Sequence, residues 1–530
     1  MYSALGEPRE FDIELLMRNH FCIGLKRGKK YICGGDANEI AKSKAVELLV
    51  ETINRIQRWR VWETWWIDEA MDEWLEKRDR LELQLRGKYD DNVVNDLLGM
   101  VNKFISYNEQ FLNHWRSVGG EVKELIDNLM SGKAEVIIWG NEKGISVYGE
   151  YVALDTHKTS TGGIIVQLVL NGLEGVTIRA PDIFMKTMSK EEYEKFINEV
   201  LRALRGGLEE TDGLAEKGKV AMNTTQVWQI VVWSMFYPGE VHALVDVINV
   251  NENGVTIKWH LKSGHKSIKG KILNDIGKLS EEEILTFVFT AVLGDGWADI
   301  TKVVINGRVY DETVIEITMS DKKFKRWEPL LDKLREMGFK SGKPYSEGNV
   351  IKVTFYGSNA INLARAMIAV LPPILRDVLD ALAFEKWLKL RRITEMEVKW
   401  RRGEVSVNIA SYRFTVNAQK HYIVLERKVK DGAEAEKVIN ALRARYGDGL
   451  QTRVNKSGKY LAVTIPMYAF EKYEDIKVQV IEVLCKKLER TKDEKKKQAI
   501  IKHLRRLTPN RGAAAVLDST NLSKDEVRNS

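Results

Sequence analysis

The most informative hydrophobic pattern in the chain is an apolar run at residues 284–293. Three glutamates precede the run, and Gly294, Asp295 and Gly296 follow it. Acidic residues favour a helix N-terminus and glycine favours a chain reversal after a helix, so the run predicts a buried helix that ends beside one carboxylate. Thr290 and Gly294 lie on one face of this helix, and their small size allows a second helix to approach closely. The run is too short to cross a membrane.

The residues after Gly296 alternate between hairpin and helix patterns. In order, they predict a hairpin at 302–319 that turns at Asn306-Gly307, a helix at 325–337, a hairpin at 340–355 and a helix at 360–370. Gly338 is well placed to end the first of these helices. With the apolar helix in front, the predicted order is helix–strand–strand–helix–strand–strand–helix.

The rest of the chain divides by pattern into further regions. The predicted boundaries give an N-terminal hairpin with a tryptophan-rich helical region (1–132), a small α+β domain (133–270), the core described above (271–392), a diverged second repeat of that core (393–490), and a basic C-terminal helix and tail (491–530). The second repeat is inferred because the order strand–helix–strand–strand–helix recurs there. Residues 206–218 are interpreted as a polar, glycine-rich link, and 133–270 shows no acidic motif that could serve as a second active site.

The N-terminal helical region contains several tryptophans at helical spacing. Trp59, Trp62 and Trp66 are placed by this spacing on one face of a helical tract at residues 37–131. Two interpretations are open: a platform on which nucleic-acid bases stack, and the apolar seam of a helical hairpin or coiled coil. The seam is favoured, because the charge-rich sequence at 68–86 fits helices that are exposed on one side and paired on the other.

The apolar helix that ends in Leu-Gly-Asp-Gly, with five further elements in order behind it, resembles the LAGLIDADG homing endonucleases over residues 281–392. The resemblance implies an α+β fold built on an αββαββα repeat. It also implies a metal-dependent, site-specific endonuclease that hydrolyses double-stranded DNA, or a degenerate relative of such an enzyme. In length and general sequence character the chain is also similar to the archaeal PaREP repeat proteins.

In that family two motif helices pack together, and each supplies one aspartate to a Mg²⁺ site. The resemblance therefore implies that Asp295 is a catalytic acid and a metal ligand, with Thr290, Gly294 and Gly296 forming the helix-packing motif. By position in the family's order, Lys352 and Arg376 supply basic groups, and Asp321 takes the place of a water-orienting polar residue. The DNA contacts implied by the alternation of polar strand residues, and by nearby basic residues, are Glu316, Thr318, Lys352, Thr354, Arg391 and Arg392. The other interpretation of the strand positions is the wet side of a half-buried sheet.

The second acid that this chemistry needs is not evident in the sequence. Asp448 is followed by glycine, but the helix before it is too charged to be a packed motif helix. Two explanations stay open. Two copies of the chain form a homodimer in which two Asp295 residues meet across a twofold axis, or the second site has been lost and the fold serves as a non-catalytic DNA-binding or regulatory protein or a decaying mobile element. A third class, a plain interaction protein, would use the tryptophan helices instead.

Composition narrows these classes only in part. With 44% hydrophobic and 30% charged residues, the chain has the composition of a globular protein, and no apolar run or signal pattern predicts a membrane, so the expected compartment is the cytoplasm. The net charge of +7, with basic runs at 391–402 and 492–511, is compatible with a nucleic-acid partner. Three cysteines cannot form a disulfide framework, and for Cys22 and Cys33 two buried thiols are favoured over a structural metal site.

Overall fold

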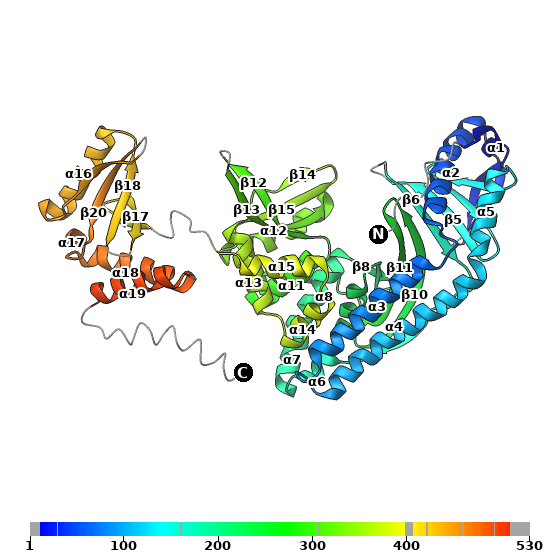
Figure 1. Ribbon diagram of the computed structural model, residues 1–530, viewed down its shortest axis with the longest axis horizontal. Coiled ribbons are helices and arrows are strands. Elements are labelled where there is room, and N and C mark those ends of the chain that lie inside the picture. The colour runs from blue at the N-terminus through cyan, green and yellow to red at the C-terminus, as the bar shows by residue number, and fades with distance from the viewer. Residues whose placement is uncertain are drawn as a thin grey trace. The chain divides into compact units, whose positions relative to one another are not determined.

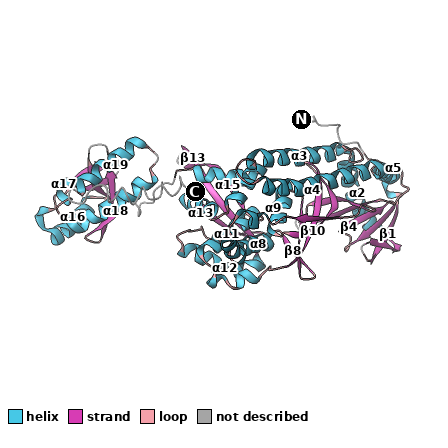
Figure 2. Ribbon diagram, turned by 90° about the horizontal axis from the view of Figure 1, so that it is seen from below, coloured by secondary structure: helices cyan, strands magenta, loops and turns pink. Residues whose placement is uncertain are grey.

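The computed structural model describes residues 11–28, 30–159, 162–305, 308–397, 406–419, 422–457, 460–491 and 493–508. The predicted turn at Asn306-Gly307 and most of the predicted C-terminal tail lie outside the described residues. The fold class is α+β, as predicted (Figure 2). The chain forms two compact units, Met1–Thr394 and Glu395–Ser530. Any finer division into domains stays an interpretation.

The first unit begins with a short helix and a hairpin, followed by four helices. Their bounds are α1 (Ile13–Met17), β1 (His20–Arg27), β2 (Lys30–Asp36), α2 (Glu39–Trp59), α3 (Trp65–Leu85), α4 (Asp91–Val118) and α5 (Gly120–Met130). Helices α3 and α4 lie side by side, and α3 contacts the large sheet (Figures 1 and 2).

The tryptophans of this region are packed inside the protein. Trp66, Trp74 and Trp115 are each no more than 2% exposed, and the rings of Trp66 and Trp115 meet edge to face with their centroids 5.3 Å apart. The seam interpretation is confirmed for these residues. The single helical face predicted for Trp59 and Trp66 is wrong, because α2 ends at Trp59, the next residue, Arg60, is left-handed with φ of 42°, and Trp66 belongs to α3.

One large sheet runs through the first unit. After β1 and β2 its strands are β3 (Glu135–Trp139), β4 (Gly144–Tyr148), β5 (Val152–Lys158), β6 (Ile164–Leu170), β7 (Val176–Ala180), β8 (Gly213–Glu216), β9 (Lys219–Thr224), β10 (Gly239–Asn251) and β11 (Gly254–Lys266). The strand order is β2-β1-β3-β4-β5-β6-β10-β11-β9-β8, with β7 paired to β10. The helices between these strands are α6 (Ile183–Thr187), α7 (Lys190–Asn198), α8 (Val200–Thr211) and α9 (Val227–Phe236).

A second sheet of the first unit follows the apolar helix, α11 (Glu281–Leu293). Its strands are β12 (Trp297–Ile305), β13 (Arg308–Ser320), β14 (Tyr345–Glu347) and β15 (Val350–Tyr356), in the order β12-β13-β15-β14. The helices are α12 (Asp321–Glu336), α13 (Ser358–Ala369), α14 (Pro373–Leu382) and α15 (Glu385–Glu395). From α11 to α13 the elements follow the predicted order.

The same arrangement occurs once before α11. The elements α8, β8, β9, α9, β10, β11 and α10 (Lys271–Asn274) repeat the order αββαββα. The strands of this earlier copy lie in the order β8-β9-β11-β10, which matches β12-β13-β15-β14 strand for strand. Figure 1 shows the two copies of the sheet on either side of α8 and α11. A copy of the core repeat therefore precedes α11.

The second unit has a sheet and a hydrophobic core of its own. Its elements are β16 (Ser406–Ile409), β17 (Tyr412–Ala418), β18 (Ile423–Val429), α16 (Gly432–Tyr446), β19 (Arg453–Ser457), β20 (Tyr460–Pro466), α17 (Met467–Phe470), α18 (Glu474–Arg490) and α19 (Glu494–Leu507). The path β17-β18-β20-β19 again has the strand order of the core repeat. Among its described residues, however, no helix precedes β16, so a packed helix that delivers an acid is missing from the part that the structure describes. That 393–490 is a diverged repeat stays an interpretation.

No single described helix is long and apolar enough to cross a membrane. The bent pair α13 and α14 reaches the required length and composition when taken together.

Candidate active site

The two copies of the repeat meet where α8 packs against α11. Helix α11 starts at a capping box, in which Glu283 N donates to Ser280 Oγ and Ser280 N donates to Glu283 Oε2. Both helices approach so closely at Gly207 that a Cβ atom there would collide with the Phe287 carbonyl oxygen and the Thr290 hydroxyl. Thr290 thus lies at the helix–helix interface, as the sequence predicts.

A second close approach lies at the C-terminal ends of the two helices. A Cβ atom at Gly294 would collide with the Thr211 hydroxyl and would lie 2.6 Å from an Asp212 carboxylate oxygen. Gly296 is equally confined, because a Cβ atom there would lie 2.7 Å from the Glu316 carbonyl oxygen. Only glycine therefore lets α11 end against α8 in this way.

Each of the two helices delivers one aspartate to the same place. Asp295 follows α11, and Asp212 follows α8. Burial, followed by the negative charge of Asp295, raises the pKa of Asp212 to about 6, although Lys386 and the hydrogen bond from Gln229 act in the opposite direction. Gln229 Nε2 donates to Asp212 Oδ2 at 3.1 Å. The site therefore contains a pair of interacting carboxylates on adjacent helix ends.

Asp212 corrects the interpretation of residues 206–218 as a link without an acidic motif. The segment Gly-Gly-Leu-Glu-Glu-Thr-Asp-Gly at 206–213 occupies the place in the first copy that Phe-Thr-Ala-Val-Leu-Gly-Asp-Gly at 289–296 occupies in the second. The sequence signal that could have indicated this second motif helix is the Asp-Gly pair preceded by small residues. Glu209 and Glu210 obscure the motif, because they interrupt the apolar run that is expected before the aspartate.

Three lysines cap the ends of the two motif helices. Lys386 Nζ, from α15, donates to the Leu293 carbonyl at 2.8 Å and also to the Gly294 carbonyl. On the other helix, Lys323 Nζ donates to the Glu210 carbonyl at 2.7 Å, and Lys269 Nζ donates to the Gly213 carbonyl. Positive charge is favourable at a helix C-terminus, where carbonyls lack partners within the helix.

Lys386 is also the counter-charge of the acid pair. Burial lowers the pKa of its ammonium, and the two carboxylates, Asp212 and Asp295, act in the opposite direction. The oxygens gathered here are two carboxylates and the two carbonyls that end α11. Such a set suits a hard divalent cation such as Mg²⁺, which prefers oxygen ligands and keeps several waters. The two carboxylates fit the metal, whereas the two carbonyls already accept hydrogen bonds from Lys386.

The predicted DNA-contact residues of β13 and β15 form one polar network. Glu316 is 8% exposed and Thr354 is 2% exposed, so both are more buried than a wet sheet surface implies. Thr354 Oγ1 donates to Glu316 Oε2 at 3.1 Å, and the Tyr345 hydroxyl donates to the same oxygen at 3.2 Å. Lys352 pairs with Glu347 and has its Nζ 3.8 Å from Glu316 Oε1. The structure brings these residues together, and Thr318 lies beside them in register with Lys352.

The remaining predicted site residues are not brought to Asp295. Arg376 lines a cavity of about 520 Å³ together with Tyr89 and Glu282, and Glu282 is in the first turn of α11, at the opposite end of the helix from Asp295. Asp321 is the exposed first residue of α12. The exposed side chains of Arg391 and Arg392 extend from α15, with the Arg391 guanidinium 5.8 Å from the Trp387 ring centre.

Asp448 has no place in the acid pair. It lies in the second unit within a short 3-10 turn, its side chain is 96% exposed, and its nearest charged partner is Arg443 at 3.6 Å. The two aspartates that the structure does bring together both belong to the first unit.

The first copy of the sheet has a charged face that corresponds to the network of the second. On β9 and β11, His260 Nδ1 lies 2.7 Å from Asn223 Oδ1. Lys262 Nζ lies 3.3 Å from a carboxylate oxygen of Glu216, on β8. Alternate residues of these strands point the other way and are buried, as expected of a half-buried sheet.

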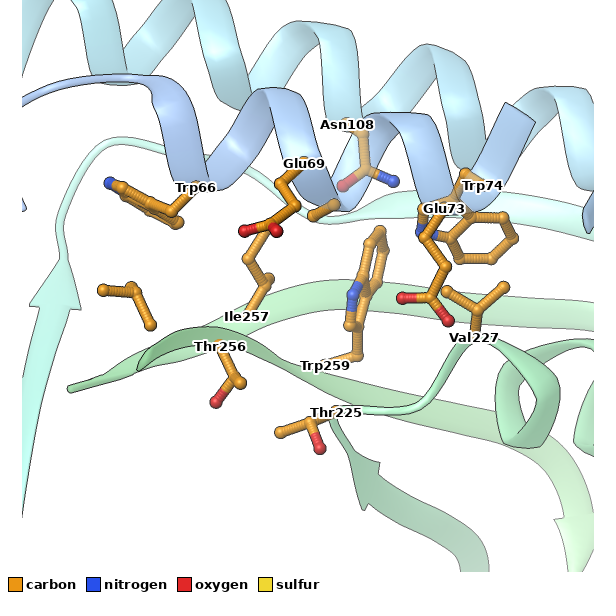
Figure 3. Close-up of a pocket in the computed structure, with 12 residues that line it drawn as sticks. Trp66, Glu69, Glu73, Trp74, Asn108, Thr225, Val227, Thr256, Ile257 and Trp259 are labelled. Atoms are coloured by element: carbon orange, nitrogen blue, oxygen red, sulfur yellow. The ribbon is translucent and has the colours of Figure 1, made fainter. Parts of the chain in front are cut away.

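A pocket of about 330 Å³ opens between α3 and β11 (Figure 3). Trp74 and Trp259 line it, and Glu69 and Glu73 extend toward it from α3. Partial loss of solvation at the pocket raises the pKa of the Glu73 carboxyl. None of the predicted site residues lines this pocket, so it is separate from the acid pair.

Comparison with known proteins gives solved structures only. No family model and no curated protein matches the chain. Full-length DUF199/WhiA from Thermatoga maritima is similar with 12% identity and a TM-score of 0.20, over 62% of this chain and 94% of that one. The I-LtrWI LAGLIDADG homing endonuclease bound to target DNA has 10% identity and a TM-score of 0.13, over 44% and 99%. The endonuclease I-GzeII in complex with its DNA target has 9% identity and a TM-score of 0.12, over 41% and 94%. Likeness at this level adds no argument to the geometry described above.

Proposed function

We propose that the chain is a metal-dependent endonuclease that hydrolyses double-stranded DNA, with Asp212 and Asp295 as its paired acids. The observation that carries the proposal is the duplication itself. Two helices pack together through glycine contacts at Gly207 and Gly294, each is followed by an aspartate, and each is followed by four strands in the same order. Two interacting carboxylates on adjacent helix ends, each beside its own copy of the repeat, fit a substrate that has two similar strands.

The roles of the residues follow from their charge and place. Asp212 and Asp295 would hold Mg²⁺, which activates water and neutralises charge that develops on the phosphate when it is bound. Lys269 and Lys323 lie at the same helix ends and offset phosphate charge. Asp212 is half-buried and Asp295 is exposed, so a cation can reach the pair from solvent while the partial burial of Asp212 strengthens its interaction with that cation.

The DNA would lie along the two sheet faces that flank the acids. Alternate strand residues present one face, so His260, Lys262 and Asn223 on the first sheet and Lys352 and Thr318 on the second are the side chains available to it. Strand residues of this kind can contact base edges in the major groove, where the four base pairs are distinguishable.

A second candidate function is non-catalytic DNA binding, and Lys386 is the observation that favours it. Its ammonium donates hydrogen bonds to the carbonyls of Leu293 and Gly294, and its positive charge offsets the negative charges of Asp212 and Asp295. A lysine that satisfies these groups permits the same platform to bind a duplex without a metal.

Cleavage and binding assays on the full-length protein separate the two functions. Supercoiled plasmid carrying the DNA that flanks the protein's own gene is incubated with Mg²⁺ and with the wild type, Asp212→Asn, Asp295→Asn or Asp127→Asn. Asp127 is an exposed acid on α5 and serves as the matched control. Metal-dependent cutting that either site variant abolishes, and the control retains, supports the endonuclease. Salt-dependent duplex binding without cutting supports the second function, and absence of both binding and cutting contradicts both proposals.

A further inference from the structure

Three neighbouring strands bring metal-type ligands to one point, far along the chain from the acid pair. His20 and Cys22 alternate on β1 and so share a face, Cys33 comes from β2, and Glu135 comes from β3. The Cys22 sulfur, the Cys33 sulfur and a Glu135 carboxylate oxygen all lie within 4.8 Å of one another. No local sequence motif joins the three, because the pairing of β1 with both β2 and β3 creates the cluster.

His20 lies beside the cluster, with its Nε2 3.3 Å from Asp36 Oδ1. In the parallel pairing of β1 with β3, His20 is the partner of Glu135, and His20 Nδ1 lies 3.5 Å from Glu135 Oε2. The His20 side chain is 55% exposed and that of Glu135 is 54% exposed, so an ion can enter from solvent on this side. An ion cannot enter from the side of Cys22, since this residue is fully buried.

We propose that Cys22, Cys33 and Glu135, with His20 as the fourth ligand, form a binding site for a thiophilic divalent metal ion, with Zn²⁺ the expected occupant. Two sulfurs, one carboxylate and one imidazole make a four-ligand set that suits tetrahedral Zn²⁺, whereas Mg²⁺ and Ca²⁺ prefer oxygen alone. Binding releases the two thiol protons to solvent, and the thiolates carry the charge that the metal neutralises.

Such a site would be structural. With four protein ligands it leaves no open position for a substrate. It joins the β1–β2 hairpin to β3, and β1 and β2 form one end of the large sheet's strand order. The site is independent of the proposed endonuclease function, because it shares no residue with the acid pair.

Metal titration of the reduced, full-length protein tests the proposal. After treatment with a chelator and a non-metal-binding reductant, the protein is titrated with Co²⁺, whose thiolate charge-transfer absorption reports sulfur ligands, and Zn²⁺ is then added to displace it. We expect one Co²⁺ per chain with a thiolate band. Cys485→Ser, which changes the third cysteine, serves as the control and retains the band.

Three variants make the outcome decisive. Cys33→Ser and Cys22→Ser are expected to remove most of the band, and Glu135→Gln to weaken binding by at least ~10-fold. Cys33 and Glu135 are partly exposed, so their variants keep the test valid if Cys22→Ser fails to fold. Absence of stoichiometric binding, or binding that Cys33→Ser leaves unchanged, overturns the proposal. So does a mass lower by two hydrogens in Cys485→Ser as purified, because only Cys22 and Cys33 can then form a disulfide within the chain.

Discussion

Asp212 is the residue whose environment has the clearest consequence for stability. Its pKa rises from 3.8 to about 6 in the fold, chiefly because the carboxyl is buried and then because Asp295 is close. A carboxyl with a raised native pKa binds more protons when folded than when unfolded. The free energy of unfolding therefore falls as the pH rises from about 4 to about 6 and remains lower above that range.

Asp212→Asn is predicted to stabilise the protein at pH 7.5 and to do so much less at pH 4. The asparagine avoids the cost of the charged form, which is on the order of 3 kcal/mol for this change in pKa. Thermal unfolding at the two pH values measures the effect, with Asp127→Asn as the exposed control. Equal stabilisation at pH 4 and pH 7.5 would show that the charge of Asp212 is not the cause.

Lys386 permits a second prediction at the same scale. Replacement by methionine keeps the length of the side chain and removes the ammonium from the carbonyls of Leu293 and Gly294. Lys386→Met is predicted to raise the affinity for Mn²⁺ by ~10-fold or more. The reason is that the electrostatic repulsion between the ammonium and the metal ion, which the substitution removes, exceeds ~1.4 kcal/mol at an effective dielectric constant near 20.

Calorimetric Mn²⁺ titration checks this prediction without reference to cleavage. Lys389→Met is the matched control, since Lys389 lies one turn further along α15 and pairs with Asp299 and Glu385. An unchanged affinity in Lys386→Met would mean that the ammonium does not compete with the ion.

At the scale of elements, the contact between α8 and α11 depends on glycine. A Cβ atom at Gly207 would meet the backbone carbonyl of Phe287, which cannot rotate away as a side chain can. Gly207→Ala is predicted to destabilise the first unit by about 3 kcal/mol through overpacking. Gly99→Ala in α4, where nothing lies within 4 Å of the new atom, is predicted to be stabilising by up to about 1 kcal/mol. Thermal unfolding of both variants measures the contrast, and similar values for the two would argue against close helix packing.

The two motif helices differ in how well the hydrophobic pattern of the sequence predicts them. Helix α11 was predictable because its apolar run, glutamates and Asp-Gly end are all local signals. The C-terminal part of helix α8 was not, because Glu209 and Glu210 look like surface residues yet are 1% and 2% exposed. Glu209 is satisfied by the Tyr237 hydroxyl and by the backbone N–H of Ile268, which are distant in sequence.

The residues of the candidate site likewise divide into those that the sequence predicts and those that it does not. Asp295, Thr290 and Gly294 could be placed from sequence because they sit on one helix. Asp212 and Lys386 reach Asp295 only through packing of elements that lie 83 residues before it, counting 295 − 212, and 91 residues after it, counting 386 − 295. Arg376 was placed by its position in an expected order, and the bend between α13 and α14 takes it to the other end of α11. Long-range packing, rather than propensity, decides these cases.

At the scale of the molecule, the two units each have their own core. In the second unit Leu425 is fully buried on β18, within a cluster that includes Phe414 and Leu442 and that its own strands and helices supply. In the first unit Leu330 is fully buried on α12. Units with separate cores unfold as separate cooperative transitions when few contacts join them.

Leu330→Ala and Leu425→Ala are therefore predicted to act on different transitions of the full-length protein. Each change removes the same side chain from a fully buried position, at a cost of about 2–5 kcal/mol. Calorimetry of the wild type should show two transitions, with Leu425→Ala lowering the one that belongs to residues 395–530 and Leu330→Ala lowering the other. Expression of residues 395–530 alone assigns the transitions, since that fragment should melt at the temperature that Leu425→Ala shifts. A single transition, or a shift of both by either substitution, would show that the units fold as one, because a loss confined to one core cannot otherwise reach the other.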